Sequence, residues 1–282
     1  MGMFANQFKT IVLLGLLTAL LLWVGSFWGS QGLTVALIFV VLMNGVTYFF
    51  SDKLVLAMYR AKPLQKSHWL YHLVHEVAQK AKLPTPKVYI IPIPTPNAFA
   101  TGRNPKHAAV ACTEGILHTL SKNELRGVIA HEIAHVKNRD ILIATIAATI
   151  AGVISYVGQM AQWGMMFGSR DSDSRGSGNI IGLLILAIIT PLVALIIQLA
   201  ISRSREYMAD ATGASIIKDP KSLAIALKKI HEGIAKHPLH HGNRATASLF
   251  IENPFKGEKL IGLFSTHPPM EERVKRLNEM KF

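Results

Sequence analysis

The sequence predicts a mainly helical membrane protein with a small β-sheet, and three patterns in it carry that prediction. Half of the 282 residues are hydrophobic, and much of this apolar content is gathered into four long blocks. Amphipathic segments of helical periodicity lie in the polar regions between and after the blocks. A few short runs rich in apolar residues, bounded by Pro, Gly and Asn, predict the strands.

The four apolar blocks are long enough to cross a bilayer. They span residues 11–27, 33–50, 141–167 and 180–201. A helical crossing needs roughly 20 apolar residues. The first block could be a cleaved signal peptide, but a second block follows almost at once, which favours a retained anchor. The last two could be buried core, but their length and lack of charge favour membrane spans. We therefore expect a four-helix transmembrane region.

Basic residues predict the orientation of this region. The second block is followed by Lys53, Arg60, Lys62 and Lys66. The positive-inside rule then places both termini and both large polar regions in the cytosol. The expected division is a transmembrane hairpin at 10–50, the first part of a cytosolic domain at 51–140, a second hairpin at 141–201, and the rest of the domain at 202–282. The net charge of +13 fits a partner bilayer of anionic lipid. No nucleic-acid recognition motif is present, so nucleic-acid binding is not expected.

The polar regions contain six further recognisable elements. We expect helices at 68–82, 223–231 and 270–280, and strands at 87–92, 97–102 and 108–113. Another helix should begin at Ser121, because Ser121 is a good N-cap and Glu124 completes a capping box. The apolar residues of that helix recur at helical spacing through Ile133.

This last helix carries the segment His131-Glu132-Ile133-Ala134-His135. Two histidines at i and i+4 project from one helix face, so both imidazoles can reach one zinc ion. The glutamate between them lies where it can act as general base on the attacking water of a peptidase. The alternative is a surface helix that carries two histidines by chance.

A catalytic zinc site needs a third protein ligand, and Glu206 is the candidate. Asp210 follows at i+4 on the same helix face, where it can hydrogen-bond a liganding histidine. The alternative is a solvated charge cluster at the membrane boundary. If each membrane helix simply continues into the cytosol, His131 lies about 15 Å, His135 about 9 Å and Glu206 about 8 Å from the apolar blocks. The zinc would then sit just above the membrane surface.

Four segments together resemble the HtpX family of membrane-bound zinc metalloproteases. They are Asn97–Gly102, His131–His135, Glu206–Asp210 and His267-Pro268-Pro269. The resemblance implies a zincin-like (gluzincin) metallopeptidase domain and an endopeptidase of the bacterial cytoplasmic (inner) membrane. It also implies one zinc ion per chain, held by His131, His135 and Glu206, with Glu132 as catalytic base. Its substrates would be polypeptides, chiefly membrane proteins, in quality control and the stress response.

Two related groups differ from this chain. The prenyl-protein (CAAX) proteases share the zinc motifs but have more membrane spans than four. The site-2 proteases place the motif inside the membrane, whereas Arg126, Lys137 and Arg139 surround it here, and charges are costly in lipid.

Two site residues have competing interpretations. His267 is a candidate donor to the tetrahedral oxyanion, and the alternative is an N-cap or core residue beside Pro268. Asn97 begins a strand that resembles the family's cleft edge, where an extended substrate could bind by strand addition. The alternative there is an ordinary surface hairpin.

Other functions use the same residues. A metal-binding membrane transporter or scaffold could hold the ion without proteolysis, but a transporter should carry ionisable groups inside its spans. The apolar blocks have almost none. An inactive protease acting as an adaptor is disfavoured because Glu132 is intact. The sequence therefore favours a membrane zinc endopeptidase.

Overall fold

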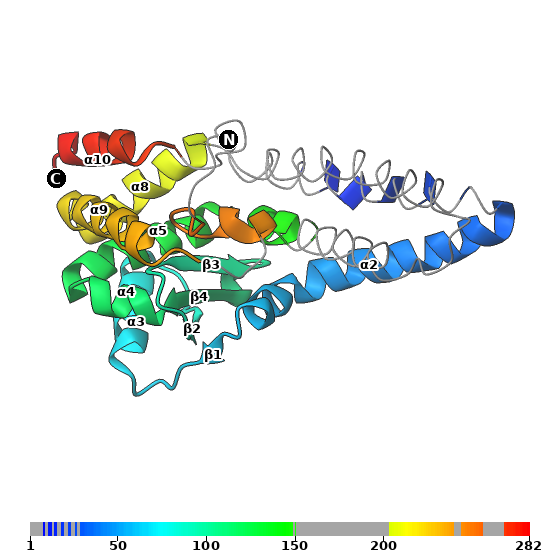
Figure 1. Cartoon of the computed structure of the whole chain (residues 1–282), viewed down its shortest axis with the longest axis horizontal. Coiled ribbons are helices and arrows are strands. Elements are labelled where there is room, and N and C mark those ends of the chain that lie inside the picture. Colours follow the sequence, from blue (N-terminus) through cyan, green and yellow to red (C-terminus); the bar gives the residue numbers. More distant parts are fainter. Residues whose placement is uncertain are drawn as a thin grey trace, which may run out of the picture.

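A long helix extends away from a domain in which helices cover both faces of a small sheet (Figure 1). The computed structural model describes residues 29–148, 203–239, 244–255 and 268–282, together with residue 150 and scattered helical residues between 8 and 26. The fourth apolar block lies outside the described residues, as do residue 149 and residues 151–167 of the third block, and His267.

The extending helix is α2, Gly29–Met58. Within the part of the chain that the structure describes, it is the one helix long and apolar enough to cross a membrane. Its most apolar stretch is only 11% buried, so it is not the core helix of a globular domain. Val35 and Leu42 are 68% and 61% exposed. Transfer of such a surface from water to lipid is favourable, which makes α2 a candidate membrane anchor.

The helix that contains the second apolar block extends beyond the end of that block. Helix α2 continues for two further turns, to Met58. Ser51, Val55 and Leu56 are buried, so these turns pack into the domain although the lipid-like stretch has ended. Ser, Asp and Lys end an apolar run without breaking a helix, because none of them lacks a backbone donor or clashes with the preceding turn. The anchor and the domain therefore share one continuous helix.

The sheet has four strands in the order β1-β2-β4-β3. The strands are β1 (Lys62–Pro63), β2 (Lys87–Ile91), β3 (Ala98–Gly102) and β4 (Ala108–Thr113). Strands β2 and β4 are parallel, and the two outer strands pair antiparallel to their neighbours. The predicted strands at 87–92, 97–102 and 108–113 are confirmed. Strand β3 lies at an edge of the sheet.

Alternate side chains of the strands enter two different cores, as the two-residue period of a strand requires. Val110 and Cys112 belong to the larger core, to which helices on that face of the sheet contribute most of the other side chains. Ala109 and Ala111 belong to the smaller core, together with the domain end of α2 and with Phe250. Both faces of the sheet are covered, which explains why its strands read as nearly continuous apolar runs.

Besides α2 and the segment 141–148, the described part of the domain contains six α-helices and two short 3-10 turns. They are α3 (Trp69–Lys80), η1 (Pro105–His107), α4 (Glu114–Thr119), α5 (Lys122–Asn138), α8 (Arg203–Ile217), α9 (Pro220–Lys236), η2 (Arg244–Leu249) and α10 (Met270–Glu279). The predicted helices near 68–82, 223–231 and 270–280 are confirmed. Helix α9 is longer than predicted, because Asp219 caps it and Pro220 occupies its first turn.

The junction between α5 and the third apolar block differs from the expected continuous helix. Helix α5 ends at Asn138, and Arg139 takes a left-handed conformation (φ 59°) that closes the helix. A separate helical segment covers residues 141–148. Ile141 and Ile143 are buried, so this segment begins inside the domain. The estimates of 15 Å and 9 Å between the histidines and the third block assumed an unbroken helix and do not apply.

Helices α5 and α8 approach each other closely at Gly213. A methyl group there would lie 2.8 Å from the backbone carbon of Ala130 and 2.8 Å from the nitrogen of His131. Alanine favours helix by about 1 kcal/mol over glycine. We nevertheless expect Gly213→Ala to destabilise the protein, by roughly 1–3 kcal/mol, because the added carbon overpacks two helix backbones. The thermal midpoint in detergent should fall. The control is Ser215→Ala on the exposed side of α8, and an unchanged midpoint for Gly213→Ala would contradict the close packing.

Candidate metal centre

The helix that carries the histidines is fixed at its first turn. The Ser121 hydroxyl accepts from the Glu124 backbone N–H, and the Glu124 carboxylate accepts from the Ser121 backbone N–H at 2.8 Å. The predicted capping box is therefore confirmed. The Lys229 ammonium of α9 also binds the Glu124 carboxylate at 2.8 Å, and this ion pair joins the start of α5 to α9. This anchoring fixes the rotation of α5, and hence the direction of its histidine face.

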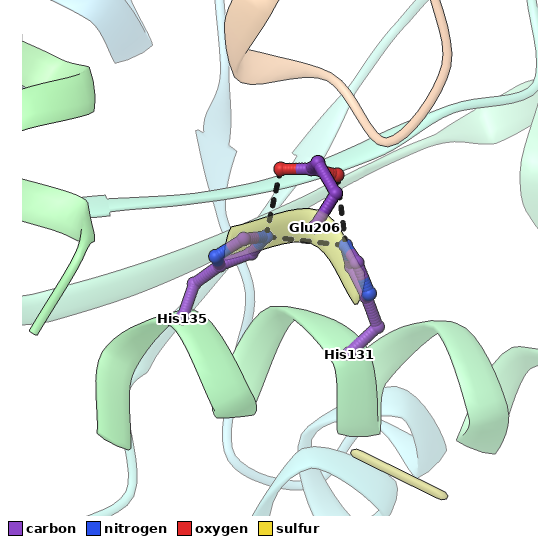
Figure 2. A group of neighbouring side chains, drawn as sticks. All are labelled: His131, His135 and Glu206. Carbon is purple, nitrogen blue, oxygen red and sulfur yellow. Dashed lines mark hydrogen bonds and ion pairs between the residues drawn. The ribbon is translucent and has the colours of Figure 1, made fainter. Parts of the chain in front are cut away.

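Three side chains from α5 and α8 converge on one point (Figure 2). The Nε2 atoms of His131 and His135 are 3.1 Å apart. One Glu206 carboxylate oxygen lies 3.7 Å from His131 Nε2, and the other lies 3.6 Å from His135 Nε2. The structure therefore brings together the two histidines and the distant glutamate that the sequence singles out.

The spacing of these atoms fits a zinc ion. Two ligand atoms of a tetrahedral zinc site, each about 2.0–2.1 Å from the metal, lie about 3.3 Å from each other. The observed separations of 3.1, 3.6 and 3.7 Å bracket that value. Two imidazoles and one carboxylate are also ligand types that zinc accepts, and three protein ligands leave one position open for chemistry.

His131 is oriented by a buried carboxylate. Its Nδ1 lies 2.9 Å from the Asp210 carboxylate, one helix turn beyond Glu206 on α8. This contact fixes the tautomer that leaves Nε2 free for a metal. Burial lowers the pKa of His131 more than the hydrogen bond that its Nδ1–H donates to Asp210 raises it, which favours the neutral imidazole that metal binding requires.

Asp210 in turn binds Arg273, a residue that the sequence did not single out. The Arg273 guanidinium is wholly buried and donates two hydrogen bonds of 2.8 Å to the Asp210 carboxylate. It also donates to the Ile251 carbonyl at 3.0 Å and lies 3.9 Å from Glu206. Burial alone would raise the pKa of Asp210, but the guanidinium and His131 lower it to about 2. The sequence gives one weak signal, since Arg273 shares its helix face with Val274 and Leu277.

His135 has a carboxylate of its own. Its Nδ1 lies 3.3 Å from Asp140, which stands between the end of α5 and the segment 141–148. Although burial favours the neutral imidazole, Asp140, Glu206 and Glu132 together raise the pKa of His135 to about 9. The sequence analysis did not single out Asp140 as a partner of His135.

We expect Asp140→Asn to weaken zinc binding by about 10–100-fold, the usual effect of losing a carboxylate that orients a liganding histidine. A competition titration with a chelator of known affinity measures this change. The control is Asp219→Asn, which alters a helix N-cap far from the metal ligands. Equal zinc affinity in wild type and Asp140→Asn would contradict the assignment.

The Glu132 carboxylate lies beside the convergent ligands in a nearly dry environment. Only 2% of its surface is exposed. Burial, opposed by His135 and helped by the nearby Glu206 charge, raises its pKa to about 8. The Ala100 backbone N–H of the edge strand β3 donates to it. A carboxylate with a pKa near neutrality is suited to both accept and return a proton.

The other two predicted site residues have different outcomes. Asn97 is buried, and its side chain donates to the Glu252 carbonyl at 2.7 Å and accepts from the Ala98 N–H. Its amide thus holds the start of β3 in place, and a role in substrate binding stays a prediction. His267 lies outside the described residues. Its role as an oxyanion donor also stays a prediction.

Backbone groups of β3 on both sides of Ala100 already have hydrogen-bond partners. The Ile251 N–H donates to the Ala98 carbonyl at 3.0 Å. The Gly102 N–H donates to the Thr145 hydroxyl at 3.3 Å. A substrate that pairs with β3 would therefore have to displace one of these contacts or engage Ala100 alone.

Comparison with known proteins identifies the family. The model of peptidase family M48 matches residues 64–281. A protein described as "Protease HtpX homolog" from Syntrophobacter fumaroxidans is 51% identical over 280 residues, covering 98% of this chain and 99% of the relative. Another of that description, from Persephonella marina, is 54% identical over 283 residues, covering 98% and 97%.

A solved structure shares the fold. The crystal structure of S. mikatae Ste24p matches with a TM-score of 0.52 at 18% identity. The match covers 98% of this chain but 65% of that chain, so the likeness concerns the fold alone. The family model and the full-length relatives thus match a chain in which His131, His135 and Glu206 could hold one metal ion. The chain therefore belongs to peptidase family M48, among the HtpX proteases, which are zinc-dependent membrane metalloproteases.

Proposed function

We propose that this protein is a zinc endopeptidase that cuts misfolded or membrane-inserted polypeptides at the cytosolic face of the bacterial inner membrane. The observation that carries the proposal is the dry Glu132 carboxylate beside three convergent ligand side chains. The proposed zinc ligands are His131, His135 and Glu206, with Asp210 as the residue that orients His131.

Each of these residues has a separate role in peptide hydrolysis. When bound, zinc supplies Lewis acidity, which polarises the scissile carbonyl and makes water a better nucleophile near neutral pH. Glu132 accepts the proton of the attacking water and passes it to the leaving amine as the C–N bond breaks. His267 is the proposed donor to the tetrahedral oxyanion, and Asn97 holds the strand beside which substrate binds.

The proposed topology follows from the charge pattern and from the anchor. The two proposed transmembrane hairpins lie within residues 10–50 and 141–201, and the second enters the bilayer only after its first residues, which pack in the domain. The two polar regions form one cytosolic domain. The exposed basic residues Lys53, Arg60, Lys62 and Lys66 lie at the domain end of α2, on the side that the positive-inside rule assigns to the cytosol. Proteins damaged by stress would reach the active site from the same side.

Removal and return of the metal test the proposal. The full chain is purified in detergent, stripped with a chelator, and assayed for cleavage of an unfolded test protein. Cleavage should be absent without metal and return with stoichiometric zinc. Zinc that binds at these ligands without restoring cleavage would overturn the proposal in favour of a metal-binding scaffold.

A further inference from the structure

Aromatic and basic side chains gather on α2 and beside it where its apolar stretch ends. They are Tyr48, Phe49, Phe50, Lys53 and Arg103, which we call the interfacial collar. Phe49 and Phe50 are 53% and 47% exposed. The Lys53 ammonium lies 5.0 Å from the centre of the Phe50 ring, and the Arg103 guanidinium lies 5.4 Å from that of Phe49. The collar thus joins the helix to the turn that follows β3.

The surroundings of several apolar side chains of α2 differ on the two sides of the collar. Before it, Val41 and Leu42 are 65% and 61% exposed. After it, Val55 and Leu56 are buried in the domain. Aromatic rings concentrate at the headgroup level of a bilayer, and cations there meet lipid phosphates. Residues 48–66 carry four basic residues and one acidic residue, Asp52, so their charge is complementary to an anionic surface.

We infer that the interfacial collar binds the headgroup layer of an anionic phospholipid bilayer and thereby sets the height of the active centre above the lipid. This inference deepens the proposed function and rests on it, because it specifies which substrates reach Glu132.

Strand β3 runs along the anchor toward the collar. At one end, the Phe99 and Tyr59 rings are 6.0 Å apart. At the other, Arg103 lies over Phe49 at 5.4 Å. The strand advances four residues between these contacts, about 13 Å, and the helix ten residues, about 15 Å. The two paths match in length, so strand and helix lie side by side with nearly parallel axes.

Because the two axes are nearly parallel, the distance from the lipid headgroups to Glu132 can be estimated along β3. Glu132 accepts from the N–H of Ala100, which is three residues from Arg103. Three strand residues span about 10 Å. A chain that leaves the bilayer therefore needs roughly three extended residues to reach Glu132. The favoured substrates are polypeptides cut in the segment directly beyond a transmembrane span, and bonds closer to the lipid than this are out of reach.

Spin labels test where the collar lies. The native Cys112 is wholly buried, so labels attach to cysteines introduced at Phe49, Arg103 and, as a control, the exposed Lys228 of α9. The full chain is placed in nanodiscs that contain anionic phospholipid. The label at 49 should respond to oxygen dissolved in lipid, and the label at 103 should lie at headgroup depth. The label at 228 should respond only to the aqueous relaxant. A label at 103 as aqueous as that at 228 would overturn the inference.

Mapping of the cleavage sites tests the inferred distance between the active centre and the lipid. An anchored substrate carries an unstructured segment directly after its transmembrane span, and a soluble peptide has the same segment without the span. Detected cuts in the anchored substrate should begin about three residues from the lipid. The double variant Lys53→Glu/Arg103→Glu should cut the anchored substrate at least fivefold more slowly in anionic nanodiscs, and the soluble peptide at the wild-type rate. Lys228→Glu should match wild type on both.

The outcomes separate two failures. If the wild-type protein does not cut the soluble peptide, the proposed function fails. If it cuts both substrates but its cuts reach the lipid boundary, or the double variant loses activity equally on both, the height inference alone is overturned.

Discussion

Replacing Glu132 by Gln is expected to abolish peptide hydrolysis while zinc stays bound. Glutamine preserves the volume of the side chain but cannot accept a proton from water. General base catalysis contributes about 100- to 10,000-fold to rate, so turnover should fall by that factor. The three proposed zinc ligands are untouched, and zinc content measured by mass spectrometry should remain one ion per chain.

The control for this change is Glu76→Gln, which alters an exposed carboxylate on α3 that pairs with Lys80. It should cut the test protein at the wild-type rate. Activity of Glu132→Gln equal to that of wild type would refute the assignment of the base. Loss of zinc together with activity would show instead that Glu132 supports the metal site.

Replacing Arg273 by Met is expected to cause the second largest loss, in stability and in zinc affinity together. The change leaves the Asp210 carboxylate buried without its guanidinium, and breaking a buried ion pair costs about 3–5 kcal/mol. Asp210 can then no longer hold the His131 ring firmly, so zinc affinity should fall by about 10–100-fold. Arg273→Lys should recover only part of both losses, because one ammonium cannot replace two parallel hydrogen bonds and the contact with Ile251.

Chemical unfolding and a zinc competition titration measure the two effects. The matched control is Arg276→Met on the same helix, since Arg276 is exposed and contacts Tyr207 and Glu272 at the surface. It should leave zinc affinity unchanged. The pH dependence gives a further readout. With its folded pKa near 2, Asp210 contributes stability that is complete above pH about 4 and is lost as the pH falls toward 2. Arg273→Met should lack most of this loss.

The parts of the centre that sequence reasoning found are those with local periodicity. A spacing of four residues places His131 and His135 on one helix face, and the same spacing relates Glu206 to Asp210. The capping box at Ser121 is equally local. These patterns depend only on helix geometry, so they could be recognised before the fold was known.

The parts that were missed depend on tertiary contacts or on a break in the chain. Arg273 lies on an amphipathic helix, where arginine is normally solvated, and only the buried Asp210 explains its position. Asp140 orients His135 because Arg139 ends α5 and turns the chain, which hydropathy does not reveal. Helix α2 likewise continues past Ser51 because a core elsewhere in the sequence accepts Val55 and Leu56. Charge and hydropathy describe the composition of a segment. Contacts with residues distant in sequence determine where its helix ends and which of its side chains are buried.

Arg273 also has a consequence for biosynthesis. It follows every other group of the centre in chain order, so a ribosome synthesises it after His131, His135, Glu206 and Asp210. Until α10 emerges and docks, the carboxylate of Asp210 has no guanidinium partner, and the first histidine is loosely held. A nascent chain in which α10 has not yet docked is therefore expected to cleave itself or its neighbours poorly, and proteolytic activity should begin only after α10 has been made.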